Sequence, residues 1–302
     1  MHTFLAYLRL TRPANILTAM ADIMLGFSIA LADARRGWSG LTLADLPWPE
    51  IGWLMLATTG LYGGGVVLND YFDADLDRVE RPERPIPSGA ATEKGALILG
   101  ALLLLLGIVA AFEAHLVSGL IAIAIALLVL LYDAWGKHQS IFGPLNMGLC
   151  RGGNLLLGIS GAAGAITNFW WMAGIPILYI AAITMVSRGE VHGSNKDTFY
   201  FAYVFYGLVI GTVVSLSWLP QFNWLTCLPF LLLFIGMIFP PLIKAAKLGE
   251  PALIGRAVKA GVLALIPLDA AIAAGFGGWQ YGLAVLLLLP FSLLLAKAFA
   301  VT

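Results

Sequence analysis

Ten long apolar segments restrict this chain to very few folds. They lie at about 14–32, 51–68, 96–113, 116–132, 144–166, 171–187, 199–219, 225–243, 256–275 and 279–299. Each has the roughly 17–25 residues that a helix needs to cross a bilayer. Hydrophobic residues make up 60% of the sequence and charged residues only 11%, unlike a soluble protein. Glycine runs such as GLYGGG predict close helix packing in lipid. The sequence therefore predicts an all-α polytopic membrane protein, with residues 1–302 forming a single transmembrane domain.

The distribution of charge predicts how the bundle is oriented. Lys plus Arg and Asp plus Glu both number 17, so the chain lacks the basic excess that a nucleic-acid partner requires. If the N-terminus is cytoplasmic, fifteen of the 17 basic residues fall on the inner side, and only Arg35 and Arg36 face outward. Such a bias agrees with the positive-inside rule. We expect an integral protein of the plasma or inner membrane with a cytoplasmic N-terminus.

The stretch NDYFDADLDRVERPERPIPSG, at 69–89, directly follows the second apolar segment. If the helix continues through it, a step of about 100° per residue places four oxygen-bearing side chains on one face. These are Asn69, Asp70, Asp73 and Asp77. Asp75 falls about 240° away from Asn69, on the other side. Carboxylates that share a face repel one another and need a positive partner. Since Mg²⁺ typically binds one or two carboxylates together with substrate phosphates, the face predicts a metal-bridged diphosphate.

A basic turn follows the acidic face. Arg78, Arg81 and Arg84 lie among the three prolines of RVERPERPIPSG, so the helix should end there in a stiff turn. Arginine side chains match the geometry of phosphate oxygens. The alternative for this stretch is a solvated cytoplasmic loop with internal salt bridges. The one-sided acidic face beside a fixed basic turn favours a phosphate site instead.

Four motifs, in order along the chain, resemble those of the UbiA-type intramembrane prenyltransferases. NDYFDADLD followed by RPERPIPSG is similar to the first aspartate-rich motif of that family, NDxxDxxxD. RLTRPANILTAM, YDAWGK and GPLNMGLCRGGNLLLG match its other marks, and the similarity covers about residues 9–275. The resemblance implies a UbiA-like bundle of nine transmembrane helices, with a polar cytoplasmic mouth above a lipid-facing cavity. The segment at 279–299 would then be an additional, tenth helix.

The resemblance also implies an enzyme that moves an isoprenyl group from a prenyl diphosphate to an aromatic or other lipophilic acceptor within the membrane. Mg²⁺ would be the cofactor and membrane lipids further partners. Four residues would hold Mg²⁺ and the diphosphate: Asn69, Asp70, Asp73 and Asp77. Arg84 and Lys137 would neutralise the leaving diphosphate. Fixed cations stabilise charge that builds on a leaving group, and a dry cavity keeps water from a carbocation.

The second aspartate-rich motif departs from the family pattern. The family has a D-x-x-x-D pair after the sixth helix, whereas this chain reads SRGEVHGSNKD, with Glu190 and Ser194 at the two positions. Glu190 would remain a metal ligand, and Asp197 could return to its face two turns later, although Gly193 weakens the helix this requires. His192 is either a substrate contact or a histidine bonded to a neighbouring loop. The altered motif resembles that of the EboC-like branch of UbiA-like proteins.

Polar residues inside apolar segments mark a candidate cavity. Arg151 and Asn154 are costly in lipid unless partnered, so both are predicted to line the cavity. Asn15 resembles a cavity-lining Asn of the family. Asp269 is expected to pair with a basic group or to remain protonated. The group that would contact the acceptor stays open among Asn15, Tyr132, Asn154 and His192.

Two other functions fit parts of the sequence. A non-catalytic UbiA-like binder or transporter of a prenylated or aromatic metabolite would explain the altered motif around Glu190. An ion-coupled transporter would use Arg151 and Asp269 as a charge pathway. That second alternative leaves the acidic face at 69–77 without a role.

Overall fold

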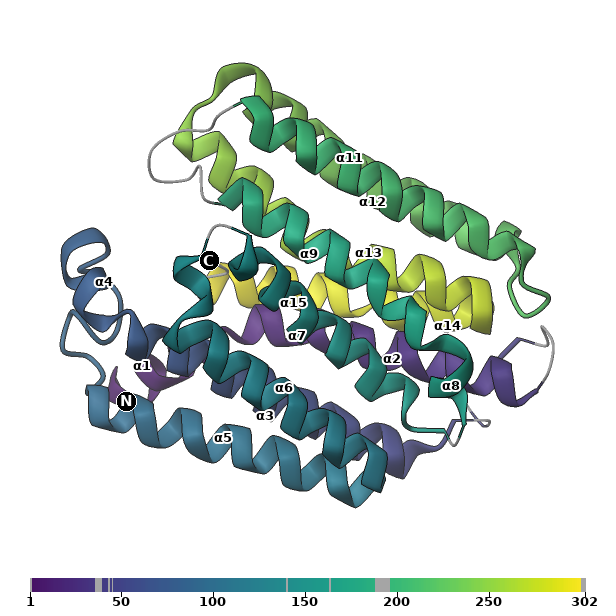
Figure 1. The fold of residues 1–302 in the computed structure, drawn as a ribbon, viewed down its shortest axis with the longest axis horizontal. Coiled ribbons are helices and arrows are strands. Elements are labelled where there is room, and N and C mark those ends of the chain that lie inside the picture. Colours follow the sequence, from purple (N-terminus) through teal and green to yellow (C-terminus); the bar gives the residue numbers. More distant parts are fainter. Residues whose placement is uncertain are drawn as a thin grey trace.

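The computed structural model is a bundle of helices (Figure 1) and describes residues 2–35, 40–42, 44, 46–139, 141–162, 164–187 and 196–299. The long helices are α2 (Pro13–Ala34), α3 (Trp48–Phe72), α5 (Glu93–Ala114), α6 (Leu116–Ala134), α7 (Phe142–Ile159), α9 (Gly174–Ser187), α11 (Lys196–Ser215), α12 (Trp224–Leu248) and α13 (Pro251–Gly277). The shorter ones are α1 (His2–Leu10), α4 (Ala74–Glu80), η2 (Gly136–His138), α8 (Ala165–Phe169), η3 (Trp170–Ala173), η4 (Leu216–Trp218), α14 (Trp279–Leu286) and α15 (Leu288–Ala298). All ten apolar segments contain helix, and no strand occurs among these residues, so the predicted fold class is confirmed.

Nine stretches of the described chain are long and apolar enough to span a membrane, and α7 is not among them. It has 18 residues, about 27 Å at 1.5 Å per residue, but its polar Asn146, Arg151 and Asn154 lower its hydropathy. The last candidate span, Trp279–Lys297, is divided into α14 and α15 at Leu287. Pro290 explains this break because it has no N–H to bond the carbonyl of Leu286.

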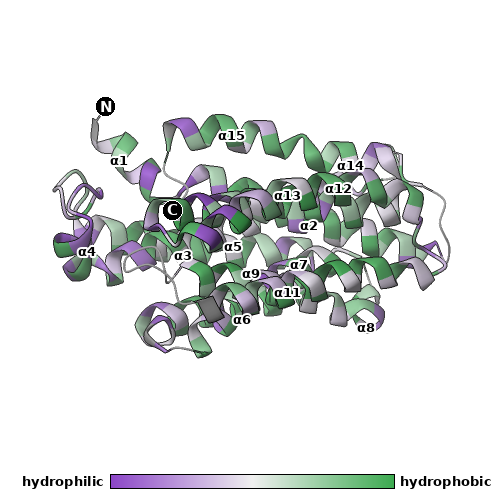
Figure 2. Cartoon of the chain, turned by 90° about the horizontal axis from the view of Figure 1, so that it is seen from above, coloured by the Kyte–Doolittle hydropathy of each residue, from purple (hydrophilic) through white to green (hydrophobic). Residues whose placement is uncertain are grey.

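Two helices form the centre of the bundle. The most apolar window of α13 is 83% buried and that of the α1–α2 stretch 78%, whereas α5, α6, α11 and α12 reach only 33%. In Figure 1, α2 and α13 run between α3, α5 and α6 on one side and α9, α11 and α12 on the other. The outer helices expose leucines such as Leu102 and Leu127, as lipid-facing surfaces do. Figure 2 shows hydrophilic residues gathered at the end that carries α1 and α4.

Glycines let neighbouring helices approach closely, as the sequence predicts. A Cβ on Gly26 of α2 would lie 2.4 Å from the backbone carbon of Gly158 in α7. On the other side of the bundle, a Cβ on Gly60 of α3 would lie 2.5 Å from the carbonyl oxygen of Leu103 in α5. Backbone atoms cannot move aside as a flexible side chain can. The α2–α7 and α3–α5 pairs therefore depend on having no side chain at these positions.

The variant Gly26→Ala is expected to destabilise the bundle by about 1–3 kcal/mol, the usual cost of overpacking, despite the higher helix propensity of alanine. Gly236→Ala in α12 is the matched control, because nothing lies within 4 Å of the added Cβ. It should leave stability unchanged or raise it slightly. Thermal unfolding of the purified variants in detergent measures both effects. Equal melting temperatures for the two variants would contradict the close α2–α7 contact.

Candidate active site

The acidic face forms where α3 passes into α4. Helix α3 ends at Phe72, Asp73 follows with φ −89° and ψ 0°, and α4 begins at the next residue. The predicted continuous helix is thus bent at Asp73. The bonds Asp73 N to Asn69 O at 2.9 Å and Asp77 N to Asp73 O at 2.8 Å nevertheless keep the helical spacing. Asp75 points away, with its side chain 95% exposed beside Arg78. The acidic array is therefore one-sided, as its spacing predicts.

Two arginines, Arg12 and Arg84, form an arginine clamp on Asp70 and Asp77, in which Arg84 binds both carboxylates. Arg84 Nη1 lies 2.7 Å from Asp77 Oδ2 and 3.2 Å from Asp70 Oδ1, and Arg12 Nη2 lies 2.7 Å from the same Asp70 oxygen. Arg84 comes from the predicted basic turn after α4. Arg12 joins α1 to α2 and has φ 47°, a left-handed conformation that costs a non-glycine residue about 1–3 kcal/mol. The ion pair with Asp70 holds Arg12 in this strained position.

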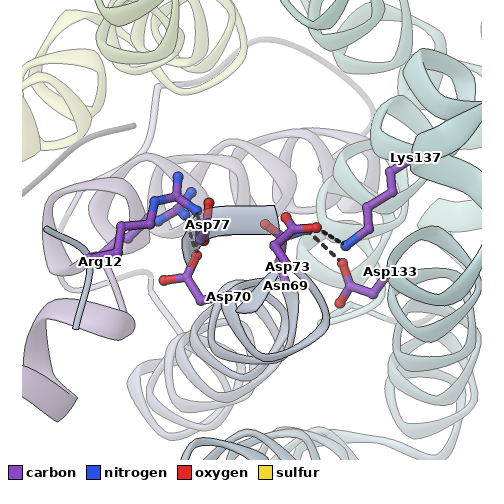
Figure 3. A network of polar contacts seen from close by, with 8 residues as sticks. Arg12, Asn69, Asp70, Asp73, Asp77, Asp133 and Lys137 are labelled. Atoms are coloured by element: carbon purple, nitrogen blue, oxygen red, sulfur yellow. Dashed lines mark hydrogen bonds and ion pairs between the residues drawn. The ribbon is translucent and has the colours of Figure 1, made fainter. Parts of the chain in front are cut away.

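A second pair of contacts connects the acidic face to α6 and η2. Lys137 Nζ lies 2.5 Å from Asp73 Oδ1, and Asn69 Nδ2 donates to Asp133 Oδ1 at 3.0 Å. Figure 3 shows Arg12 on one side of the acidic residues and Lys137 with Asp133 on the other. Asp133 Oδ2 is buried and has no hydrogen-bond partner among the described residues. The acidic face thus lies between cations from three separate parts of the chain.

A cavity of about 450 Å³ opens from this face into the bundle. Its polar end includes Asn69, Asp73, Asp77 and Arg84. Its apolar walls come from α3, α6, α9 and α13, and include Leu61, Val66, Ile125, Val129, Ile180, Val262 and Leu265. This shape suits an elongated molecule with an anionic head and a hydrocarbon chain, because the head meets cations while the chain avoids water.

Deeper polar residues form a network on α2, α3 and α7. Arg151 contacts the Thr18 hydroxyl at 3.1 Å and pairs with Asp22, with Nε to Oδ2 at 2.5 Å. Asn154 donates to the same Asp22 oxygen at 2.8 Å and accepts from Thr58 Oγ1 at 2.7 Å. In α13, the buried Asp269 carboxylate has one oxygen, Oδ2, without a hydrogen-bond partner among the described residues. The network balances the charge of Arg151 inside the bundle and ties α2, α3 and α7 together.

The structure brings most of the predicted site residues together. Asn15, Tyr132, Arg151 and Asn154 line the same cavity as Asn69, Asp73 and Asp77. Asp70 lies beneath the arginine clamp with its side chain 7% exposed, outside the cavity lining. Glu190 and His192 fall outside the described residues, as does the side chain of Asp197.

Three residues of the site, Arg12, Asp22 and Asp133, were not among the predicted site residues. Arg12 belongs to the RLTRPANILTAM stretch and binds Asp70. Asp133 lies inside the YDAWGK motif, and its place before Lys137 was the available signal. Asp22 is a carboxylate within a 22-residue helix, and an acid in such a setting is a functional candidate by default.

With this fold and site, the chain belongs to the UbiA prenyltransferase family, whose model matches residues 37–247. Digeranylgeranylglyceryl phosphate synthase of Methanosarcina mazei is 33% identical over 192 residues, or 63% of this chain and 65% of that one. The Methanoregula boonei enzyme of the same name is 34% identical over 182 residues, or 60% of this chain and 58% of that one. The matched stretches thus span less than two thirds of these relatives.

Solved structures share the fold. A structure described as digeranylgeranylglyceryl phosphate synthase superimposes with a TM-score of 0.67 at 21% identity, covering 92% of this chain and 99% of that one. A UbiA homologue from Archaeoglobus fulgidus bound to GPP and Mg²⁺ gives 0.53 at 16% identity, covering 93% and 99%. An apo homologue from Aeropyrum pernix gives 0.56 at 15% identity, covering 92% and 98%. At these identities the likeness establishes the fold alone.

The acidic face retains oxygen atoms for a hard cation. Asp70 and Asp73 are bonded through Oδ1 and Asp77 through Oδ2, and the second oxygen of each makes no hydrogen bond or ion pair within the described residues. Among the described residues, no three His, Cys, Asp or Glu side chains lie together as a group that could hold a metal ion. Mg²⁺ commonly takes one or two carboxylates and completes its shell with water and phosphate. The donors present fit that ion.

Proposed function

We propose that this protein transfers an isoprenyl group from a prenyl diphosphate to a lipophilic acceptor in a Mg²⁺-dependent reaction. One observation carries the proposal: a cluster of carboxylates and cations stands at the mouth of a largely apolar cavity. The mouth suits a diphosphate and the cavity suits its hydrocarbon chain. Membership of the UbiA prenyltransferase family supports the same reaction class.

The proposed chemistry breaks the bond between the allylic carbon and the diphosphate oxygen. The electron pair leaves with diphosphate, the acceptor forms the new bond to that carbon, and the acceptor loses a proton. Arg84, which lines the cavity, and Lys137, which pairs with the cavity-lining Asp73, would stabilise the charge that builds on the leaving group. Preorganised cations of this kind are among the strongest catalytic contributions. The apolar walls at Val66, Val129 and Leu265 would exclude water from the carbocation.

Asp73 and Asp77 are the proposed Mg²⁺ ligands, because both line the cavity and both keep an oxygen for the ion. When bound, Mg²⁺ neutralises part of the diphosphate charge. Asn69 and Asp70 are proposed to hold this half of the site, Asn69 through Asp133 and Asp70 through the arginine clamp. Glu190 remains the proposed ligand of the second half, with His192 and Asp197 as substrate contacts.

The acceptor is proposed to be a lipid that is oriented by polar residues within the cavity. Asn15, Tyr132, Arg151 and Asn154 all line it. The relatives are named digeranylgeranylglyceryl phosphate synthases, so geranylgeranylglyceryl phosphate is the first acceptor to test. We place the N-terminus and the cavity mouth on the cytoplasmic side, as the charge distribution predicts. The chain is proposed to be one domain with a core at about 9–275 and an added segment at about 279–299.

Product formation tests this function. Purified protein with Mg²⁺, geranylgeranyl diphosphate and geranylgeranylglyceryl phosphate should release diphosphate and yield a lipid heavier by one geranylgeranyl group. Replacing Mg²⁺ with EDTA should lower the rate by about 100-fold or more, since the metal balances leaving-group charge. Mass spectrometry of the extracted lipid detects the product. A metal-independent rate would contradict the proposed role of the acidic face.

A second candidate is a non-catalytic binder or transporter of a prenylated or aromatic metabolite. Glu190 and Ser194, in place of an aspartate pair, favour it, since they remove a carboxylate from the second motif. The two candidates differ in one result. A carrier would bind prenyl diphosphate but form no product with aromatic or lipid acceptors.

A further inference from the structure

A second cavity, of about 600 Å³, adjoins the first. Arg12, Arg81 and Arg84 line both cavities and form the wall between them. Asp73 and Asp77 line only the first cavity, whereas Asp70 lines only the second. The remaining walls come from α1, from the turn at 83–90 and from the end of α15. The second cavity is therefore a neighbour of the candidate diphosphate site and not a part of it.

The second cavity is strongly cationic. Five cationic side chains line it, namely Arg9, Arg12, Arg81, Arg84 and Lys297, against the carboxylates of Asp70 and Glu83. Asp70 is already bonded to Arg12 and Arg84. The side chains of Arg9, Arg81 and Lys297 have no hydrogen bond or ion pair with any residue that the structure describes. Clustered cations repel one another, so an anion in this cavity would relieve an unfavourable arrangement.

Tertiary contacts bring these cations together from distant parts of the chain. The Tyr7 hydroxyl accepts a hydrogen bond from Thr92 N at 3.2 Å, which fixes α1 against the start of α5. Ser292 donates to the carbonyl of Ala14 at 2.8 Å, which fixes α15 against α2. Lys297 follows five residues later on α15. The cavity is thus assembled by the fold from residues near both ends of the chain.

We propose that this cavity binds the phosphate of a second lipid, beside the prenyl diphosphate. Arginine forks bind phosphate oxygens through paired charge-assisted hydrogen bonds. Ala6, Ala296 and Phe299 supply apolar lining next to the cations, which favours a lipid phosphate over free inorganic phosphate. Binding of a lipid phosphate in this cavity does not require prenyl transfer, so the inference goes beyond the proposed function. Only the use of the cavity for the phosphate of an acceptor rests on that function.

Direct binding in neutral detergent tests the site. Three probes separate the possible sources: dioctanoyl phosphatidic acid, dioctanoylglycerol without phosphate, and inorganic phosphate. Phosphatidic acid should bind at least about 10-fold more tightly than either of the others. The double variant Arg9→Gln, Lys297→Gln should weaken its binding by about 10-fold or more, since it removes two charge-assisted contacts. Equal binding of dioctanoylglycerol would overturn the proposal.

A matched variant controls for loss of charge at the membrane surface. Lys244→Gln, Lys247→Gln removes two exposed lysines of α12, which line neither cavity, and should leave phosphatidic acid affinity unchanged. Equal weakening by both double variants would overturn the proposal. Saturation with geranyl diphosphate and Mg²⁺ should not displace phosphatidic acid. Displacement would place the lipid phosphate in the first cavity and contradict a separate site. If geranyl diphosphate does not bind at all, the proposed function fails while the phosphatidic acid result still stands.

Discussion

Asp73→Asn is expected to lower the rate of prenyl transfer by at least about 100-fold. Asp73 occupies the bend between α3 and α4, pairs with Lys137 at 2.5 Å and lines the cavity. The amide keeps the size of the side chain but removes the charge that a metal ion needs. It also leaves Lys137 without its partner. Steady-state kinetics with geranylgeranyl diphosphate and Mg²⁺ measures the loss, which should appear mainly in kcat/KM.

Asp75→Asn is the control for that variant. Asp75 lies two residues along the chain but on the other side of the helix, with its side chain 95% exposed. Its replacement should change the rate by less than about twofold, because an exposed ion pair contributes little. Melting temperatures of both variants show whether the fold is retained. Equal losses of rate in the two variants would show that the total negative charge of the segment matters, and not the position of the carboxylates on one face of the helix.

Arg151→Met is expected to destabilise the bundle by about 3 kcal/mol or to prevent recovery of folded protein. Arg151 is 6% exposed and bonds Thr18 and Asp22 across α2 and α7. Methionine can fill much of the space, but it leaves the buried Asp22 carboxylate without its cation. Breaking a buried ion pair by removing one partner costs about 3–5 kcal/mol in soluble proteins, and polar contacts in membrane proteins are often weaker. Unfolding in detergent measures the change.

A double variant makes the Arg151 prediction specific. Asp22→Asn together with Arg151→Met removes the uncompensated charge, so it should be more stable than the sum of the two single changes predicts. Lys247→Met on α12 is the surface control and should have little effect. An Arg151→Met melting temperature equal to that of the wild type would contradict the structural role of the network.

The sequence predicts the fold well because membrane helices carry strong local signals. The ten apolar segments give ten helical regions, since length and hydropathy are properties of each segment alone. The bend at Asp73 was not predicted, because nothing in the local sequence demands it. The break at Leu287 has a signal in Pro290, but an apolar run of spanning length hides it. Local spacing thus determines which helices form and does not determine how they bend.

The acidic face was predicted correctly because it depends on helical spacing within one segment. Its partners were harder to predict because they come from distant positions. Arg12 and Asp70 are 58 residues apart, and Lys137 and Asp73 are 64 apart. Such pairs depend on which helices become neighbours, and the periodicity of a single helix contains no information on this. Asp133 lies on α6 inside the YDAWGK motif, but its hydrogen bond to Asn69 is visible only in the folded structure.

The second motif remains a prediction from sequence, because Glu190, His192 and Ser194 lie outside the described residues. The arginine clamp and the Asp73–Lys137 pair are formed by residues between 12 and 137. The cavity is lined by described residues between 12 and 265. The central claim of a diphosphate site can therefore be tested through the first motif alone.

The most direct test is the binding of geranylgeranyl diphosphate to purified protein, measured by calorimetry with Mg²⁺ and with EDTA. The wild type should bind only with Mg²⁺, because the carboxylates would otherwise repel the diphosphate. Asp73→Ala should lose that binding by about 100-fold or more, while Asp75→Asn should retain it. Binding that is equally tight without Mg²⁺ and in Asp73→Ala would contradict a metal-bridged diphosphate at the acidic face.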